Sequence, residues 1–540
     1  MSSASSSHHS THNDENQYAG MIKQSYFKIL RNHFFNLFTY LDSVVPNFFP
    51  MHEVVTVWRM IQFIGPCLCA ANNLLWEHNK TPGKAVSILS IFFHIVPVEY
   101  RRDASVVVEF IYCGVNILFF VIIVASAYYY KKAARLPTYL PSILSVYIHT
   151  VGYLIHPINL NLVGEDVGRF IDGQTPALHL SIEILSIVLS LICFAIWFWF
   201  FDQISVVSFL FRPNSLLSVL SSTQTFIFIT TNIVTFVLAV ASHLSKYPNA
   251  VLNMIAALIY LVGLTSVYTP GSYINSAHRR LVFSSSISAC LFTFVMGIYV
   301  ITGRKASFVE LFILVIVLIV VYLLSFLVLK SSLRNQMKWL DDYHDKVITI
   351  DDFKNPNQVV KYGITGMQFA HPACLNWQIF REGSERWPEN VKIWVTFGKF
   401  VAIYPQENML LSHIIFAMTA NKLSGNLAKQ SIAQAKTIYT QRESSLSTTL
   451  KGKLNRCNKH VQTTKRKLRH VWDLAIQGSI NEMEASINAA YQSVNKSRSY
   501  FNHFLSQYPN NRFVARSYLR FILEIEGDPK KYQEWSEKVG

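Results

Sequence analysis

The feature that most constrains this chain is a series of apolar segments, each about long enough to cross a lipid bilayer. A helix needs roughly 20 apolar residues to span about 30 Å of hydrocarbon. Eight runs of about this length are present, at residues 54–75, 106–128, 141–158, 179–201, 222–242, 250–269, 281–301 and 308–329. A ninth run, residues 86–98, is shorter and contains His94 and Pro97. We therefore expect an all-α, polytopic membrane bundle of eight spans, or of nine if the short run also crosses.

Composition and charge also indicate a membrane protein with a basic polar part. Hydrophobic residues make up 51% of the 540 residues and charged residues 15%, whereas soluble domains carry about 25% charged residues. Residues 331–540 contain 29 Lys and Arg against 18 Asp and Glu, so they carry +11 of the net charge of +16. Basic segments favour the cytoplasmic face beside anionic lipid. We therefore expect a polar tail with an amphipathic helix at 1–53, a membrane bundle at 54–329 and a cytoplasmic helical domain at 330–540.

The charged loops predict the orientation, because short loops rich in Lys and Arg remain in the cytoplasm. Three loops are basic and contain Lys131, Lys132 and Arg135; His278, Arg279 and Arg280; and Lys330, Arg334 and Lys338. One loop is acidic and contains Glu165, Asp166 and Asp172. With eight spans, these four loops place both termini in the cytoplasm, and we expect the membrane to be the plasma membrane. Four cations disagree with this orientation, namely Arg101, Arg102, Arg304 and Lys305.

Three ionisable residues lie inside the predicted spans, where a charge is costly and often functional. They are Arg59, Glu109 and Glu183. Arg59 could pair with either carboxylate and fix helix packing, or the three could line a polar cavity for a ligand or an ion. In the first span Gly65 precedes Pro66, and proline removes a helix hydrogen bond. We therefore expect a kink at this point.

The segment at residues 21–50 has the pattern of an amphipathic helix. Its apolar side chains recur every three or four residues, at Phe27, Leu30, Phe34, Leu37 and Leu41, and its polar side is basic. Such a helix can lie in the interface of the inner leaflet. The alternative is a helix packed on the soluble domain.

The polar region after residue 330 has a helical pattern with a weak internal repeat. Phe400–Asn408 resembles Phe504–Arg512, and in each copy a Tyr-Pro pair is expected to end one helix and precede another. A fainter copy surrounds His371-Pro372, and Asp528-Pro529 predicts the start of a last helix. Helical hairpins of this kind are typical of tetratricopeptide-like arrays, which stack into partner-binding surfaces. A plain helical bundle is the alternative.

Between the two copies lies a long helical stretch that is both heptad-like and basic. The predicted seam consists of Leu454, Cys457, Val461, Thr464, Leu468, Val471 and Ala475. The basic side chains are Lys451, Lys453, Arg456, Lys459, Lys465, Arg466, Lys467 and Arg469. These cations are candidates for contact with lipid or with an acidic partner, at about 1 kcal/mol per charge near a membrane. The alternative is a solvated helix face.

The sequence carries no motif for catalysis, a cofactor or a metal. It has no phosphate-binding loop, dinucleotide fingerprint, kinase signature, serine-hydrolase elbow or H-E-x-x-H pair. Cys67 and Cys69 have the wrong spacing for a zinc site and lack a second pair, and nucleic-acid-binding motifs are missing. We therefore expect no enzyme activity, cofactor, metal site or nucleic-acid partner. The expected partners are the lipid bilayer and a cytoplasmic protein, and self-association is left open.

Several motifs resemble one family of protist proteins. The motifs are Val57–Pro66 and Gly83–Ser90 in the membrane region, and His371–Trp377, Glu385–Asn390, Lys399–Pro405, Gln441–Glu443, Lys465–Arg469, Trp472-Asp473, Ile476–Gly478 and Pro509–Arg516 in the polar region. From about Val54 to the C-terminus, the chain resembles the N-terminal membrane and helical-repeat regions of two groups in this family. These are the receptor-like adenylate/guanylate cyclases of parasitic flagellates and the relatives named after tiny-macrocyst proteins.

This resemblance implies a role in cyclic-nucleotide signalling. In the cyclase members the catalytic domain lies far downstream, and this chain ends at Gly540 without it, which suggests a truncated member. The first hypothesis is a non-catalytic, receptor-like or scaffold protein whose helical array binds a cytoplasmic partner. The second is the sensory half of a cyclase that pairs with a full-length relative. The third is a transporter with Arg59, Glu109 and Glu183 along its path.

Overall fold

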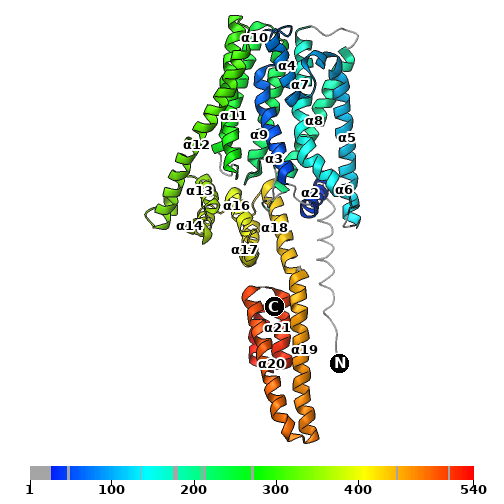
Figure 1. The fold of residues 1–540 in the computed structure, drawn as a ribbon, viewed down its shortest axis with the longest axis vertical. Coiled ribbons are helices and arrows are strands. Elements are labelled where there is room, and N and C mark those ends of the chain that lie inside the picture. The colour runs from blue at the N-terminus through cyan, green and yellow to red at the C-terminus, as the bar shows by residue number, and fades with distance from the viewer. Residues whose placement is uncertain are drawn as a thin grey trace, which may run out of the picture. The chain divides into compact units, whose positions relative to one another are not determined.

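The chain folds into helices, as predicted. The computed structural model describes residues 26–45, 49–133, 136–173, 180–207, 209, 211, 215–268, 273–444, 448–508 and 511–539. Over these ranges it contains helices and one isolated β-bridge, between Ser218 and Tyr273, and no extended strand (Figure 1). Two compact units divide the chain: Met1–Trp387, which we call the membrane unit, and Pro388–Gly540, the C-terminal unit.

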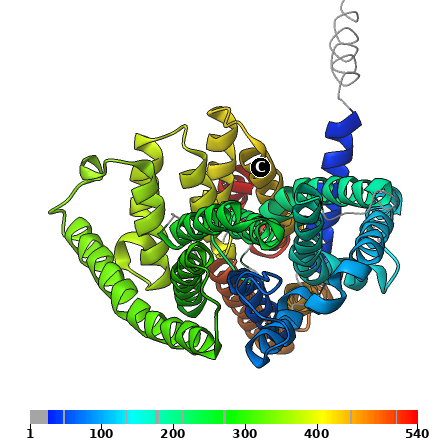
Figure 2. The ribbon, with the colours of Figure 1, turned by 90° about the horizontal axis from the view of Figure 1, so that it is seen from above.

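Seven helical segments of the described membrane unit are long and apolar enough to cross a bilayer. They are α5 (Arg101–Ala133), α6 (Leu140–Val146) continued through a π-helical turn at Tyr147–Val151 into α7 (Gly152–Ile171), α8 (Leu180–Val207), α9 (Ser221–His243), α10 (Lys246–Tyr268), α11 (Ser276–Thr302) and α12 (Phe308–His344). Their outward side chains are apolar, for example Phe312 and Leu323 on α12. Seen from above, α12 lies at one edge of this bundle, on the opposite side from α5 and α8 (Figure 2).

The first predicted span is not one continuous helix. Helix α3 (Phe49–Ile64) ends before Pro66, where a 3₁₀ turn (Gly65–Leu68) leads to Cys69 in a left-handed conformation with φ of 47°. The expected kink at Pro66 is therefore wrong: the α-helix stops there, because proline supplies no N–H to continue it. Helix α4 (Thr81–His94) has 14 residues, about 21 Å, and is too short to cross 30 Å of hydrocarbon.

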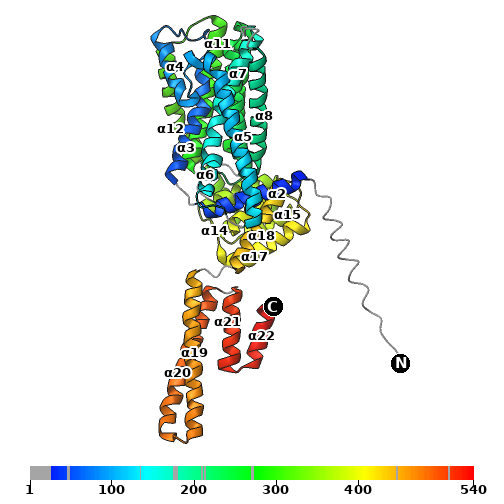
Figure 3. The same cartoon turned by 90° about the vertical axis from the view of Figure 1, so that its right-hand side faces the viewer.

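Helix α2 (Tyr26–Val44) lies across one end of the helical bundle, and α4 lies at the opposite end (Figure 3). The predicted apolar face is buried, since Phe34, Leu37 and Leu41 pack with side chains of α5 and α8. The ring centroids of Phe34 and Phe200 are 5.0 Å apart. The partner of this face is therefore the end of the helical bundle. The side chain of Phe27 lies outside the described part of the chain.

The acidic loop expected after residue 158 is also wrong. Helix α7 continues to Ile171, so Glu165 and Asp166 are helical, and both are buried. Asp172 is the capping residue that follows the last turn of α7. The apolar run ends early because these carboxylates have partners inside the bundle, as described below. Arg135, which was assigned to a basic loop, lies outside the described residues.

The polar helices after residue 330 are divided between the two units. The expected boundary at 330 lies inside α12, which continues to His344 and packs against α13 (Pro356–Gln368) and α14 (Pro372–Leu375). The ring of Trp339 stacks on Tyr362 with centroids 4.4 Å apart. Helix α15 (Gln378–Arg386) completes this part, and the compact units divide after Trp387.

The C-terminal unit is helical throughout its described residues. It contains α16 (Val391–Val401), α17 (Asn408–Ala420), α18 (Asn426–Ser444), α19 (Thr448–Gln477), α20 (Ile480–Gln507), α21 (Arg512–Phe521), a π-helical turn (Ile522–Glu526) and α22 (Pro529–Val539). Tyr404 and Tyr508 each lie between two helices, which confirms the predicted helix ends. Asp528 accepts the amide of Lys531 at 3.0 Å and so caps α22 as predicted.

Helices α19 and α20 form an antiparallel hairpin along most of the predicted seam. Leu454, Cys457, Val461 and Thr464 are buried, but the last layer is Leu474, because Ala475 is exposed. Thr464, expected to be a weak layer, donates or accepts hydrogen bonds with the hydroxyls of Ser493 and Ser497 at 2.8 and 3.2 Å.

Candidate functional site

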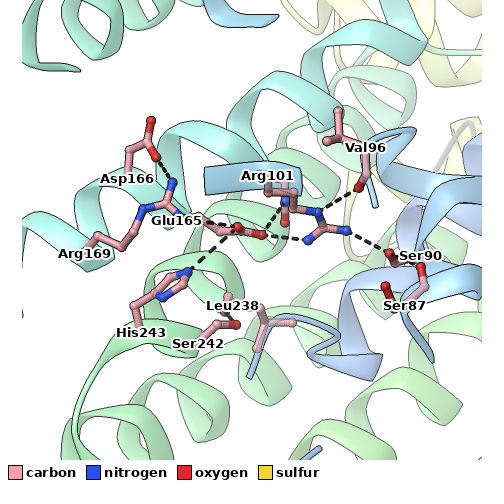
Figure 4. Close-up of polar contacts among 11 residues, drawn as sticks. Ser87, Ser90, Val96, Arg101, Glu165, Asp166, Arg169, Leu238, Ser242 and His243 are labelled. Atoms are coloured by element: carbon pink, nitrogen blue, oxygen red, sulfur yellow. Dashed lines mark hydrogen bonds and ion pairs between the residues drawn. The ribbon is translucent and has the colours of Figure 1, made fainter. Parts of the chain in front are cut away.

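A buried ionic network joins α4, α5, α7 and α9 within the membrane unit (Figure 4). Arg101 at the start of α5 and Glu165 on α7 form its centre. Their side chains are 1% and 2% exposed, and Arg101 Nη1 lies 2.7 Å from Glu165 Oε1. The other two guanidinium nitrogens donate to the Val96 carbonyl oxygen and the Ser90 hydroxyl, both at 2.9 Å. Each guanidinium nitrogen therefore has an acceptor inside the protein.

Glu165 has further partners on α7 and α9. Asn161 Nδ2 donates to Glu165 Oε1 at 2.9 Å. Glu165 Oε2 lies 3.8 Å from Nη1 of Arg169 and 3.8 Å from Nε2 of His243. Arg169 also forms a close ion pair with Asp166 on its own helix. One carboxylate thus connects the first turn of α5 to the last turns of α7 and α9.

Two glycines on α7 bring the backbones of α7 and α9 close together. A Cβ atom at Gly164 would lie 2.8 Å from the carbonyl oxygen of Phe236, and one at Gly168 would lie 2.7 Å from that of Val240. These glycines form a G-x-x-x-G pattern, which allows close helix packing in membranes. The close approach is what places His243 beside Glu165.

Two of the three sequence-predicted intramembrane residues lie at the edge of this network. Glu109 on α5 is fully buried, and neither carboxylate oxygen has a partner at full hydrogen-bond distance and angle, although Ser186 and Asp166 lie near it. Asp166 and Arg169 are the charged groups that interact electrostatically with Glu109. Glu183, which is half-buried on α8, interacts in the same way with Asp166.

Carboxylates outnumber guanidinium groups in this network. Arg101 and Arg169 face the fully buried Glu109, Glu165 and Asp166. An ionised carboxylate in an apolar interior is very costly unless it is paired. The third carboxylate therefore requires a proton or another positive charge, and His243, 3.8 Å from Glu165, is the group in the network that carries one when it is protonated. Among the described residues no group of three or more His, Cys, Asp and Glu side chains could hold a metal ion, so the chemistry favours a proton, on a carboxylate or on His243, over a bound metal.

A small cavity adjoins the network where α3 is interrupted. It is lined by Pro66 and Cys69 from the interruption and by Arg101, Glu165 and Ser242, among other residues. Its volume of about 10 Å³ corresponds to about one water molecule. In the described structure the site therefore has room for water or a proton beside the ion pair, but none for an organic ligand.

Arg59, the third predicted residue, lies apart from this network. Its Nη1 donates to the Ser215 hydroxyl at 3.0 Å, and its guanidinium lies over the Tyr153 ring at 4.4 Å. The structure does not form the expected pair of Arg59 with Glu109 or Glu183. A hydroxyl and an aromatic face replace the carboxylate, and the two glutamates lie with Asp166 instead.

The basic residues of α19 are mostly solvent-exposed. Lys453, Arg456, Lys459, Arg466, Lys467 and Arg469 are exposed. Lys465 donates to Glu524 at 3.1 Å. Arg520 and Lys465 both bond to the Glu524 carboxylate, and they lower its pKa. The side chain of Lys451 lies outside the described part of the chain.

Comparison with protein-family models, curated proteins and solved structures gives no significant match for this chain. The candidate site therefore rests on its own geometry.

Sequence reasoning missed the centre of the network, although two signals were present. Arg101 was one of the cations on the wrong side of the predicted topology, and it is buried against Glu165 instead of lying in a loop. Asn161, Glu165 and Arg169 follow one another at intervals of four, which places them on one helix face. His243 lacked any such signal, because its role depends on where α9 packs.

Proposed function

We propose that the chain is a non-catalytic, multispan membrane protein of receptor-like or scaffold type, and that its C-terminal unit binds a cytoplasmic protein partner. The observation that carries this proposal is the course of helix α12. This single helix begins inside the membrane bundle and ends among the polar helices α13 to α15 of the same unit. A displacement of its apolar half would be passed directly to those helices.

The two halves of α12 are held differently. The apolar half has many exposed side chains and packs mainly on α11. The polar half is firmly fixed: Gln336 Oε1 accepts from the Thr365 hydroxyl at 2.7 Å, and Asp341 Oδ1 lies 3.1 Å from His371 Nε2. The apolar half is thus loosely packed and the polar half tightly packed, and this difference supports the transfer of a movement of α12 in the membrane to helices α13 to α15. The exposed cations that follow the apolar half of α12, namely Lys330, Arg334 and Lys338, support a cytoplasmic position for the chain after this helix, and we place the protein at the plasma membrane.

The surface proposed for the protein partner is the exposed face of α17. Met409 and Phe416 are both exposed and are seven residues apart, so they share one helix face. Tetratricopeptide-like stacking of the Tyr-Pro hairpins remains part of this proposal. The expected partner is a full-length cyclase relative, as the sequence resemblance implies.

The test uses the full chain with a photoreactive residue at position 416, and the same residue at the exposed Lys436 of α18 as control. Crosslinking of a nucleotidyl cyclase from position 416 alone supports the partner proposal and its cyclase version. Crosslinking of a different, single protein supports the scaffold version. Identical patterns from both positions contradict partner binding at α17.

The alternative, that the chain is the sensory half of a cyclase in cyclic-nucleotide signalling, is tested separately. Deletion of the gene should then change cyclic-nucleotide levels in the cell. Unchanged levels would count against it and leave the scaffold version in place.

One observation favours a transporter as a second candidate. The interruption of α3 at Gly65-Pro66 and the short helix α4 border the cavity beside Arg101 and Glu165. Interrupted helices beside buried charges are found in secondary transporters. Proton movement into proteoliposomes by the wild type, lost in Glu109→Gln, would support this candidate. If the wild type moves no protons, or if neutralising Arg59, Glu109 and Glu183 together leaves flux unchanged, the candidate fails.

A further inference from the structure

The turn end of the α19–α20 hairpin combines exposed apolar and basic side chains. The chain reverses at Gly478, whose φ is 74°. Within about three helical turns of it, Trp472, Ile476 and Ile480 are 70%, 84% and 78% exposed. Ile487 and Tyr491 on α20 are also exposed. We call these five residues the hairpin tip. Large exposed apolar groups that lie together mark interaction sites.

No other helix of the C-terminal unit covers the tip in the described structure. The core that joins the hairpin to α21 and α22 involves Leu454 and Val461 on α19 and Phe501 and Phe504 on α20, far from Gly478 along both helices. Figures 1 and 3 both show the turn end of the hairpin extending past α21. The exposure of the tip is thus built into the fold of this unit.

Two basic side chains lie on the same helix face as Trp472 and Ile476. Lys465, Arg469, Trp472 and Ile476 follow one another at spacings of four, three and four residues, which places them along one face of α19. Lys465 is paired with Glu524 at 3.1 Å, whereas Arg469 on this face, and Arg466 and Lys467 on the adjoining sides of the helix, form no ion pair within 4 Å in the described structure. Their charge therefore remains available to an anionic partner.

We propose that the hairpin tip binds an anionic lipid surface. A tryptophan with isoleucines and arginines is the combination that enters the interface of a bilayer, with the rings at headgroup level and the cations near anionic lipid. The tip is the end of a two-helix hairpin. Such an end can insert into a bilayer interface, whereas binding to a protein would require a groove of matching shape. The chain also carries apolar helices of membrane length, so the protein is expected to reside where lipid surfaces are present.

The test uses the full chain in nanodiscs of phosphatidylcholine, with a fluorophore attached at Gln477→Cys. All seven native cysteines are buried, so the label goes to the new thiol. Phosphatidylserine is supplied either in added vesicles or in the disc itself, and exposure of the label is measured by quenching with the neutral reagent acrylamide. A label at Asn455→Cys, 22 residues earlier on the exposed side of α19, is the control.

We expect phosphatidylserine, but not phosphatidylcholine, to protect the label at position 477 and to leave position 455 exposed. Replacing Arg466, Lys467 and Arg469 together by Gln should weaken the binding of vesicles roughly a hundredfold, at about 1 kcal/mol per charge. The same replacement at Lys453, Arg456 and Lys459 should have little effect. Those residues lie about 20 Å or more from Trp472 along the helix, beyond a Debye length of about 10 Å at 0.1 M salt.

Trp472→Ala with Ile476→Ala should also abolish protection, since the charges alone do not insert. No protection of position 477 by phosphatidylserine in either arrangement would overturn the proposal. Equal effects of the two charge triplets would refute the assignment to the tip. Protection by soluble polyglutamate as strong as that by phosphatidylserine would replace the lipid surface by an acidic protein.

Discussion

Removal of the Arg101 guanidinium should destabilise the membrane unit far more than removal of an exposed arginine. Arg101→Met eliminates the buried pair with Glu165 and the hydrogen bonds to Val96 and Ser90. Breaking a buried ion pair from one side costs about 3–5 kcal/mol, because a buried charge loses its partner. Glu165 would keep Asn161 as a donor, so we expect about 3 kcal/mol. The matched control is Arg304→Met. That arginine is 66% exposed and lies 3.6 Å from Glu310, so its loss should cost about 0–1 kcal/mol.

The cysteines provide the assay. All seven are buried, and six of them belong to the membrane unit. A thiol-reactive fluorophore will therefore report unfolding as the protein is heated in detergent. For the unit Met1–Trp387, an unfolding entropy of about 2.1 cal/mol/K per residue gives a shift of about 1.2 °C per kcal/mol, so Arg101→Met should lower the midpoint by roughly 4 °C.

A double variant separates the ion pair from general damage to packing. Arg101→Met with Glu165→Gln leaves no unpaired charge, so it should recover much of the stability lost in Arg101→Met alone. The reasoning is refuted if Arg101→Met is no worse than Arg304→Met. It is also refuted if the losses of the two single variants simply add, since residues in direct contact should show coupling.

Three further outcomes follow from the geometry. Glu109→Gln, which resembles a protonated glutamate, should shift the thermal midpoint much less than Glu165→Gln, because Glu165 is paired with arginine whereas Glu109 forms no ion pair within 4 Å in the described structure. A shift as large as that of Glu165→Gln would mean that Glu109 is ionised and paired. Gly168→Val should destabilise the membrane unit in the same assay, because a Cβ there would lie 2.7 Å from a backbone oxygen of α9; an unchanged midpoint would mean that α7 and α9 are not in close contact. Burial lowers the pKa of Lys399 from its ordinary value of 10.5 to about 8, so between these values the unfolded chain binds a proton that the folded chain does not, and stability should rise with pH over this window by up to about 3 kcal/mol. Thermal unfolding of the full chain, followed by circular dichroism at several pH values, should show this slope in the wild type and a reduced slope in Lys399→Met; an equal slope in both would assign it to another group.

Local patterns were sufficient for most of the helices. Seven of the eight predicted apolar runs of membrane length correspond to long helices, because such a run satisfies its backbone groups only as a helix in hydrocarbon. The first run, residues 54–75, is interrupted after Ile64. Phe34, Leu37 and Leu41 share a helix face by spacing alone, and that face is buried. The turn at Tyr404 and the cap at Asp528 depend on a few neighbouring residues, so they too were predictable.

Hydropathy failed where charges are compensated at a distance. Glu165 and Asp166 ended the apolar run and therefore predicted a loop, yet both are buried in α7. Their helix continues because Arg101 and Arg169 neutralise them, and Arg101 lies 64 residues before Glu165. Arg101 is itself one of the four cations that disagreed with the predicted orientation, and its burial against Glu165 explains that disagreement.

By itself, the sequence determined what depends on neighbours along the chain: helix lengths, helix ends, apolar faces and the basic surface of α19. Only the tertiary structure decided which charges meet. It separated Arg59 from the glutamates and joined Arg101, Glu165 and His243 into one network. The physical reason is that α7 and α9 come into contact only where Gly164 and Gly168 leave room for the backbone of α9. The cost of a buried charge is set by partners that no local pattern specifies.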